Sequence, residues 1–221
     1  MNCVTLAAPF NRGNRLMNDA VNRIRRKLLF GIMTLPITGL ANAAIRTPDA
    51  SEGPFYPSPS MRFDDIDNDL VIISGRIEQA GGEIVRLKGR VLDRDGKPVE
   101  SAQVEIWQCD VNGRYLHRGD SGGRSRDNGF QGFGHDVTNA DGEFTFRTIK
   151  PVPYTSRTPH IHLKVLVAGK EQLTTQLYLA DHPGNDGDWL YRRIPQQQRE
   201  LVTMHFKKTD QEPLAEVELV I

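Results

Sequence analysis

Short stretches in which apolar and polar residues alternate recur along most of this chain, with turn-forming residues between them. Alternation with a period of two places the apolar side chains on one face of a β-strand. Asp95-Gly96, Asp141-Gly142 and Ala168-Gly169 separate such stretches, and glycine at these places favours tight turns. The sequence therefore predicts an all-β fold, a β-sandwich, with strands at 87–92, 102–107, 143–149, 160–167, 173–179, 201–206 and 215–221.

The predicted strand at 160–167 carries two histidines on its polar side, His160 and His162. Residues two apart on a strand share a face, with Cα atoms roughly 6.5–7 Å apart. Both imidazoles could therefore reach one metal ion from a single rigid strand. Taken alone, such a pair is more often only the polar face of a half-exposed strand.

Two tyrosines change that balance. Tyr154 lies in the proline-rich loop P-V-P-Y shortly before His160, and Tyr115 lies in a long glycine-rich connection, about 109–135. Either tyrosine alone would more often be a packing aromatic. If all four side chains converge, two phenol oxygens and two imidazole nitrogens suit a high-valent iron better than zinc. That ligand set indicates oxygen chemistry.

Four segments in order carry a family resemblance: T-P-D-A-S-E-G-P-F-Y-P (47–57), G-R-V-L-D-R-D-G-K-P-V-E-S-A-Q-V-E-I-W-Q-C-D-V-N-G-R-Y (89–115), G-F-G-H to P-V-P-Y (132–154) and R-T-P-H-I-H-L through T-T-Q-L-Y-L (157–179). In this combination the chain resembles the intradiol ring-cleavage dioxygenases of the protocatechuate 3,4-dioxygenase type. The resemblance implies a β-sandwich with long active-site loops, in which loops and one strand hold iron at an edge. Residues 47–60 should be extended and pack against the body or a neighbouring subunit.

The resemblance also implies a mononuclear, non-haem Fe(III) site and a residue-by-residue assignment. Tyr115 and His160 would be equatorial ligands, with Tyr154 and His162 axial and a water or hydroxide in the fifth place. A catechol would bind as a dianion, displacing Tyr154 and the hydroxide, which take its protons. O2 would then open the ring between the two hydroxyl-bearing carbons. Arg157 would stabilise the negative charge that develops on the ring.

Gln176 is a further catalytic candidate, because it faces away from its neighbours Thr175 and Leu177 on the predicted strand at 173–179. It is equally compatible with an ordinary polar strand residue. The chain departs from the family pattern in its short loop between Tyr154 and Arg157, which lacks a following aromatic residue. Because that loop helps to shape the substrate pocket, the identity of the catechol stays open.

The N-terminus has the features of a cleaved export signal, residues 1–43. A basic stretch (23–27) precedes an apolar run (28–40) that is too short to span a bilayer, and Ala41-Asn42-Ala43 is a cleavage site of the A-x-A type. Arg25-Arg26 resembles a twin-arginine signal, with the Sec route as the alternative. Met17 offers a later start. The expected mature domain is residues 44–221, in the periplasm or secreted, without stable membrane insertion.

Cleavage would remove six basic residues and one acidic residue, so that the formal net charge changes from 0 to about −5. Nothing in this balance indicates nucleic acid as a partner. The expected partners are a catecholic substrate and O2. A monomer or a homo-oligomer is plausible, because one chain carries the whole ligand set. The alternative function is a non-catalytic metal-binding or ligand-binding β-sandwich module of the cell envelope, since transthyretin-like modules share the turn pattern D-x-D-G-x-P-V.

Overall fold

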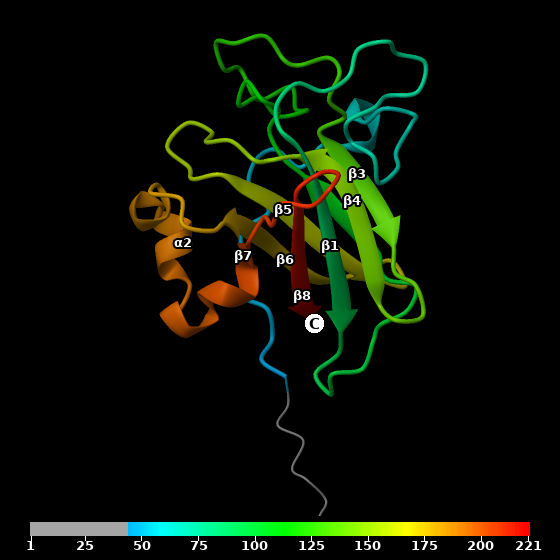
Figure 1. Cartoon of the computed structure of the whole chain (residues 1–221), viewed down its shortest axis with the longest axis vertical. Coiled ribbons are helices and arrows are strands. Elements are labelled where there is room, and N and C mark those ends of the chain that lie inside the picture. The colour runs from blue at the N-terminus through cyan, green and yellow to red at the C-terminus, as the bar shows by residue number, and fades with distance from the viewer. Residues whose placement is uncertain (1–43) are drawn as a thin grey trace, which may run out of the picture. The chain divides into compact units, whose positions relative to one another are not determined.

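The structure is a computed structural model that describes residues 44–221. Its strands form a three-stranded sheet in the order β4-β1-β8 and a five-stranded sheet in the order β3-β2-β5-β6-β7, seen in Figure 1. Residues 1–43, which carry the expected export signal, lie outside the described residues. The strand bounds are Ile84–Leu92 (β1), Gln103–Trp107 (β2), Phe133–Val137 (β3), Glu143–Ile149 (β4), His160–Val167 (β5), Lys170–Leu179 (β6), Thr203–Met204 (β7) and Leu214–Val220 (β8).

One apolar cluster fills the space between the sheets. Leu87 and Phe146 come from the three-stranded sheet, whereas Ile106, Leu163 and Leu177 come from the five-stranded sheet, and all five are fully buried. Burying a large apolar side chain contributes about 1.5–3 kcal/mol. This packing makes the five-stranded sheet a rigid support for whatever lies on its other face.

Strand β5 lies between β2 and β6 in the five-stranded sheet, and residues 160–165 are buried on both of its faces. Ile161 and Leu163 face the core, while His160, His162 and Lys164 face the opposite side. That side is covered by the N-terminal segment, residues 44–57. A side-chain amide of β6 donates to the Ser51 carbonyl, and Lys164 pairs with Glu52.

The N-terminal segment is extended and packs against its own chain. The backbone N–H of Thr47 donates to Val220 O at 3.0 Å, and that of Ala50 donates to Thr174 O at 2.8 Å. The Thr175 hydroxyl donates to Pro48 O at 2.8 Å. The segment therefore ties β6 and β8, which belong to different sheets, and covers the histidine face.

The turns expected from the sequence are formed. Ala168 and Gly169 both have positive φ, 49° and 74°, as a two-residue hairpin turn between β5 and β6 requires. Gly142 has φ 72°, and a Cβ there would lie 2.6 Å from Val91 O, so only glycine fits.

Two details of the predicted strands are wrong. The sequence predicts no strand at 133–137, where the long connection at about 109–135 ends. The backbone of β3 instead pairs with β2 throughout, Phe133 opposite Trp107. In the predicted strand at 201–206, residues 201–202 end a 3-10 helix, η3 (Gln196–Val202), and only Thr203–Met204 pair as β7. The extent of β7 is therefore set by its pairing with β6 and not by the alternation of apolar and polar residues.

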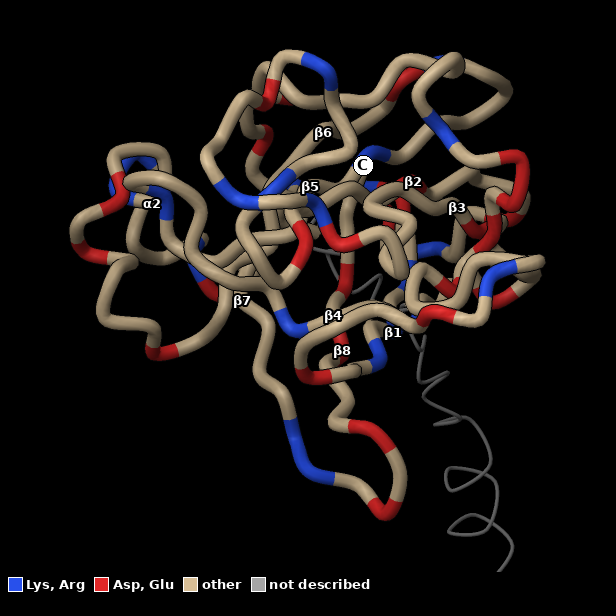
Figure 2. Tube along the Cα trace, turned by 90° about the horizontal axis from the view of Figure 1, so that it is seen from above, with Lys and Arg blue, Asp and Glu red and all other residues tan. Residues whose placement is uncertain are grey.

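The helices are short: η1 (Pro59–Met61), η2 (Asn185–Gly187), α2 (Trp189–Arg193) and η3. In the described part of the chain no helix is long and apolar enough to cross a membrane. Figure 2 shows basic and acidic residues interspersed along the Cα trace. The long connection between β2 and β3, green in Figure 1, extends beyond the ends of the strands.

Candidate metal centre and active site

The two histidines of β5 lie side by side on its covered face. His160 Nε2 is 3.2 Å from His162 Nε2, and their ring centroids are 4.8 Å apart. In register, His162 lies between Trp107 of β2 and Gln176 of β6, and the Trp107 ring stacks on it at 4.8 Å and 11°. Strand pairing on both sides therefore fixes the position of His162, and pairing with β6 fixes that of His160.

The hydrogen bonds fix the tautomer of His160. Its Nδ1 lies 2.7 Å from Thr158 O, and a carbonyl oxygen can only accept, so Nδ1 carries the proton. The lone pair of His160 Nε2 therefore points toward His162. On His162, Nδ1 is buried and has no hydrogen-bond partner among residues 44–221. With the proton of His162 on Nδ1, the two Nε2 lone pairs would face each other, an arrangement that a shared cation would stabilise.

Tyr115 reaches the same point from the loop between β2 and β3. Its Oη lies 3.3 Å from His160 Nε2, and the residue is 2% exposed. The loop is held by carboxylates: the backbone N–H of Tyr115 donates to Asp120 Oδ2 at 2.7 Å, and Asp110, itself fully buried, accepts from the backbone N–H of Arg114. The long connection is thus an ordered loop that delivers one tyrosine.

Tyr154 completes the cluster from a tight turn. The backbone N–H of Arg157 donates to Tyr154 O at 2.8 Å, and Thr155 has φ 46°. The Tyr154 ring meets the Tyr115 ring edge-on, with centroids 5.1 Å apart. It is half-buried, whereas Tyr115 and both histidines are buried. Among the four candidate ligands it is the one that solvent or substrate can reach most easily.

Burial favours the uncharged form of all four side chains. It lowers the pKa of His160 to about 4, and, with the charge of neighbouring groups, lowers the pKa of His162 well below its usual value. It raises the pKa of Tyr115 well above the ordinary phenol value and also raises the pKa of Tyr154. A bound trivalent cation reverses this preference for the phenols, because its charge favours the phenolate form.

The donor set fits ferric iron. His160 Nε2 lies 3.3 Å from Tyr115 Oη and 3.2 Å from His162 Nε2, and the Tyr154 ring lies against the Tyr115 ring. Within residues 44–221 no group of three or more His, Cys, Asp or Glu side chains could hold a metal. The two tyrosines add hard oxygen donors, which favour Fe(III) when they bind as phenolates.

Arg157 and Gln176 lie together beside this cluster. Arg157 Nη2 donates to Gln176 Oε1 at 2.7 Å, and the positive charge of Arg157 contributes to the lowered pKa of both histidines. The structure thus brings together every residue that the sequence analysis singled out.

Sequence reasoning missed several neighbours of the cluster. Phe55 of the N-terminal segment stacks on Tyr115 at 5.2 Å and meets Tyr154 edge-on at 5.6 Å. Trp107 stacks on His162, and Asp188 pairs with Arg157. Phe55 and Trp107 fall within the segments that carried the family resemblance. No local pattern shows that they touch the ligands, because their contacts are made across the fold.

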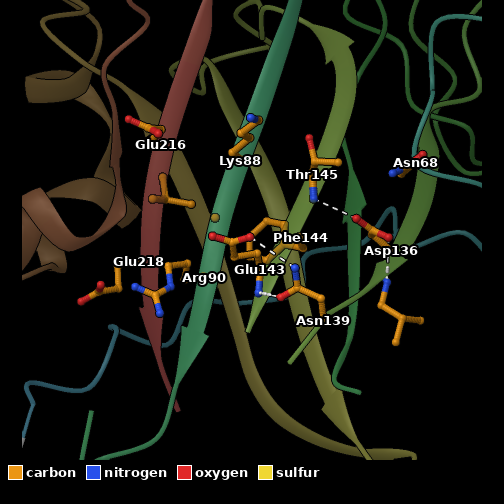
Figure 3. Close-up of a pocket in the computed structure, with 13 residues that line it drawn as sticks. Asn68, Lys88, Arg90, Asp136, Asn139, Glu143, Phe144, Thr145, Glu216 and Glu218 are labelled. Carbon is orange, nitrogen blue, oxygen red and sulfur yellow. Dashed lines mark hydrogen bonds between the residues drawn. The ribbon is translucent and has the colours of Figure 1, made fainter. Parts of the chain in front are cut away.

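A separate groove of about 780 Å³ lies on the outer face of the three-stranded sheet and is drawn in Figure 3. It contains none of the candidate site residues. Lys88 and Arg90 of β1 project there, opposite Glu216 and Glu218 of β8. Alternating charges of this kind are typical of a solvated sheet face, so the groove adds nothing to the site.

Comparisons with known proteins agree with this arrangement. A family model described as Dioxygenase matches residues 51–219. The protocatechuate 3,4-dioxygenase beta chain of Burkholderia cepacia is 33% identical over 150 residues, 64% of this chain and 63% of that protein. The catechol 1,2-dioxygenase of Candida albicans is 27% identical over 212 residues, 82% of this chain and 62% of that protein. The matched regions therefore span less than two thirds of these curated relatives.

A solved structure supports the fold along most of the described region. It is the dioxygenase domain of a dioxygenase carbohydrate-binding protein fusion from Streptomyces sp. SirexAA-E. The sequence identity is 30% and the TM-score 0.61, with 80% of this chain and 98% of that chain covered. The predicted all-β sandwich is confirmed.

Proposed function

This chain belongs to the intradiol ring-cleavage dioxygenase family, as its motifs indicated, and we propose that it cleaves a catechol between the two hydroxyl-bearing carbons, incorporating both atoms of O2. The observation that carries the proposal is the cluster of Tyr115, His160 and His162 beside Tyr154 and Arg157. Within it, His160 Nε2 lies 3.3 Å from Tyr115 Oη and 3.2 Å from His162 Nε2. A non-catalytic sandwich module has no need of such a cluster, and the match to a dioxygenase family disfavours it.

Tyr115, Tyr154, His160 and His162 are proposed to hold one Fe(III). When bound, ferric iron supplies the Lewis acidity that makes a chelated catechol reactive toward O2. The two phenolates neutralise much of the ferric charge and so favour the oxidised metal. Trp107 holds the ring plane of His162, and the Thr158 carbonyl holds His160 in the tautomer that leaves Nε2 free.

Tyr154 is the proposed proton acceptor. Its ring is half-buried and sits in a short turn, whereas Tyr115 is enclosed by Phe55 and by the loop that Asp120 holds. The side chain of Tyr154 can therefore move with little loss of packing. Its phenolate oxygen would take a catechol proton as the substrate binds, since a phenol that is no longer beside the metal charge recovers its high proton affinity.

Arg157 is proposed to stabilise negative charge on the substrate. Its guanidinium is held at two nitrogens, by Gln176 and Asp188, so that it is in place before reaction. A fixed positive charge beside the substrate ring stabilises negative charge that develops during oxygen attack, without reorganisation at that moment.

The substrate class follows from the cluster and from relatives whose names include protocatechuate, catechol and hydroxyquinol dioxygenases. A panel of these three compounds, read out by oxygen uptake with iron-loaded protein, tests the proposal. We expect one O2 consumed per substrate, and protein of reddish colour from phenolate-to-iron charge transfer. Colourless protein that consumes no O2 with any of the three would refute it.

We also propose export to the periplasm or beyond, by the twin-arginine or the Sec route. The support is the basic stretch, apolar run and A-x-A site in residues 1–43. One chain provides all four proposed ligands, which is compatible with a monomer or a homo-oligomer. N-terminal sequencing of the protein from its native source should give a mature start near Ala44. Full-length protein in the cytoplasm would contradict export.

A further inference from the structure

Asp188, at the N-cap of α2, has a carboxylate that reaches Arg157. Its Oδ2 accepts a hydrogen bond from Arg157 Nε at 2.7 Å and another from the backbone N–H of Thr158 at 3.0 Å. Its Oδ1 accepts from the backbone N–H groups of Leu190 and Tyr191, both at 3.0 Å. With four donors and a side chain that is 0% exposed, this carboxylate has one defined position.

Gln176 holds the guanidinium from a second side. Its Nε2 donates to Ser51 O at 2.8 Å, which fixes the orientation of the amide and turns Oε1 toward Arg157 Nη2. Oε1 also accepts from the Tyr178 hydroxyl at 3.1 Å. Arg157 is therefore held at Nε by a charge and at Nη2 by a neutral oxygen. These two bonds leave Nη1 as the terminal nitrogen that neither Asp188 nor Gln176 holds.

We propose that Asp188 is a positioning residue for ring cleavage: it fixes the Arg157 guanidinium beside the ligand cluster, with Nη1 left free for negative charge on the substrate. This inference rests on the proposed function. A bond to Nε restricts the rotation that would otherwise move the whole guanidinium, because Nε is the nitrogen nearest the flexible stem. Displacement of a catalytic group by about 1 Å can cost on the order of 100-fold in rate.

The alternative role for Asp188 is purely structural, as the N-cap of α2. Its two oxygens separate these roles, since Oδ1 caps the helix and Oδ2 binds Arg157. In Asp188→Asn, an amide NH2 group takes the place of Oδ2 and cannot accept the hydrogen bond from Arg157 Nε. The remaining oxygen, in the place of Oδ1, still caps α2. In Asp188→Ser the hydroxyl is a good N-cap but is too short to hold Arg157 as well.

Full-length, iron-loaded variants are compared in three ways. Oxygen uptake gives kcat and KM, elemental analysis gives the iron content, and absorbance gives the visible spectrum. Asp188→Asn should lower kcat by about 10- to 100-fold, with KM, iron content and visible band nearly unchanged. In an Arg157→Leu background, Asp188→Asn should cause no further loss of kcat, because its effect passes through the guanidinium. Should Asp188→Asn fail to fold, Asp188→Ser is measured in both backgrounds instead.

Asp69→Asn is the matched control. Asp69 also accepts from a backbone N–H, that of Val71, and pairs with Arg147 at 3.1 Å, outside the ligand cluster. The Asp69→Asn substitution should leave kcat per bound iron unchanged. Wild-type kcat in the Asp188 variants would overturn this inference but not the proposed function. An equal loss of kcat from the Asp188 substitution in the wild-type and Arg157→Leu backgrounds would do the same. A wild-type protein inactive on every catechol would overturn the proposed function and, with it, this inference.

Discussion

Replacing Arg157 by leucine should separate catalysis from metal binding. The change leaves the Asp188 carboxylate, 0% exposed, without its countercharge. Breaking a buried ion pair costs about 3–5 kcal/mol, and the three backbone N–H groups that remain on Asp188 argue for the lower end, about 3 kcal/mol. For a domain of this size that corresponds to a decrease in Tm of roughly 6–12 °C.

The kcat of Arg157→Leu should fall much further than its loss of stability explains. Removal of a preorganised charge stabiliser costs roughly 100-fold or more in kcat. None of the four proposed ligands is altered, so iron content and the visible band should stay at wild-type levels. The assay is oxygen uptake per bound iron, at a temperature well below the Tm of the variant, with urea unfolding measured on the same protein.

Arg147→Leu is the control for lost stability. Arg147 of β4 pairs with Glu212 at 2.7 Å and with Asp69 at 3.1 Å, and its side chain is 19% exposed against 12% for Arg157. It should destabilise the fold without lowering kcat per iron. Wild-type kcat in Arg157→Leu, or an equal loss in Arg147→Leu, would refute the assigned role.

Further predictions concern the metal and the fold. His160→Ala should lose most bound iron and colour, and full iron content by elemental analysis would reject the ligand assignment. Tyr56→Phe removes a hydroxyl that donates to the buried Glu105 at 2.6 Å, so the free energy of unfolding should fall by about 1–2 kcal/mol, and an unchanged urea midpoint would contradict that. Gly89→Ala should destabilise by about 1–3 kcal/mol in the same assay, because its Cβ would lie 2.3 Å from the Phe144 ring; wild-type stability would show that the ring can move freely.

The histidine pair is the part of the site that local sequence could predict. A period of two places His160 and His162 on one face, and the structure shows them so, with Gln176 in register beside His162. The full burial of that face was not predictable from the strand itself. It arises because residues 44–57, far away in sequence, lie across it.

The tyrosines could be placed only through the family resemblance. Tyr115 owes its position to Asp120 and Asp110, whose carboxylates accept backbone N–H groups of the long loop. No periodicity records such contacts. Asp188 was missed for the same reason: it caps a short helix locally, and its bond to Arg157 bridges segments that only the fold brings together.

Strand β3 and the region of β7 show that local sequence also predicts secondary structure incompletely. Phe133–Val137 form a strand because β2 offers a free edge for pairing. Leu201 looks like the start of a strand, yet the preceding residues form η3 and only Thr203 and Met204 reach β6. In both places tertiary pairing overrides the local pattern.

The most direct test of the account is the identity of the ring-cleavage product. Iron-loaded protein would be incubated with the active catechol under oxygen-18-labelled O2, and the product identified by mass spectrometry and absorbance. Two tyrosines and two histidines, with no carboxylate in the cluster, favour ferric rather than ferrous iron and hence attack between the hydroxyl-bearing carbons. The account predicts a cis,cis-muconic-type diacid that carries both labelled oxygen atoms. A yellow semialdehyde, formed by cleavage outside the two hydroxyls, would contradict it.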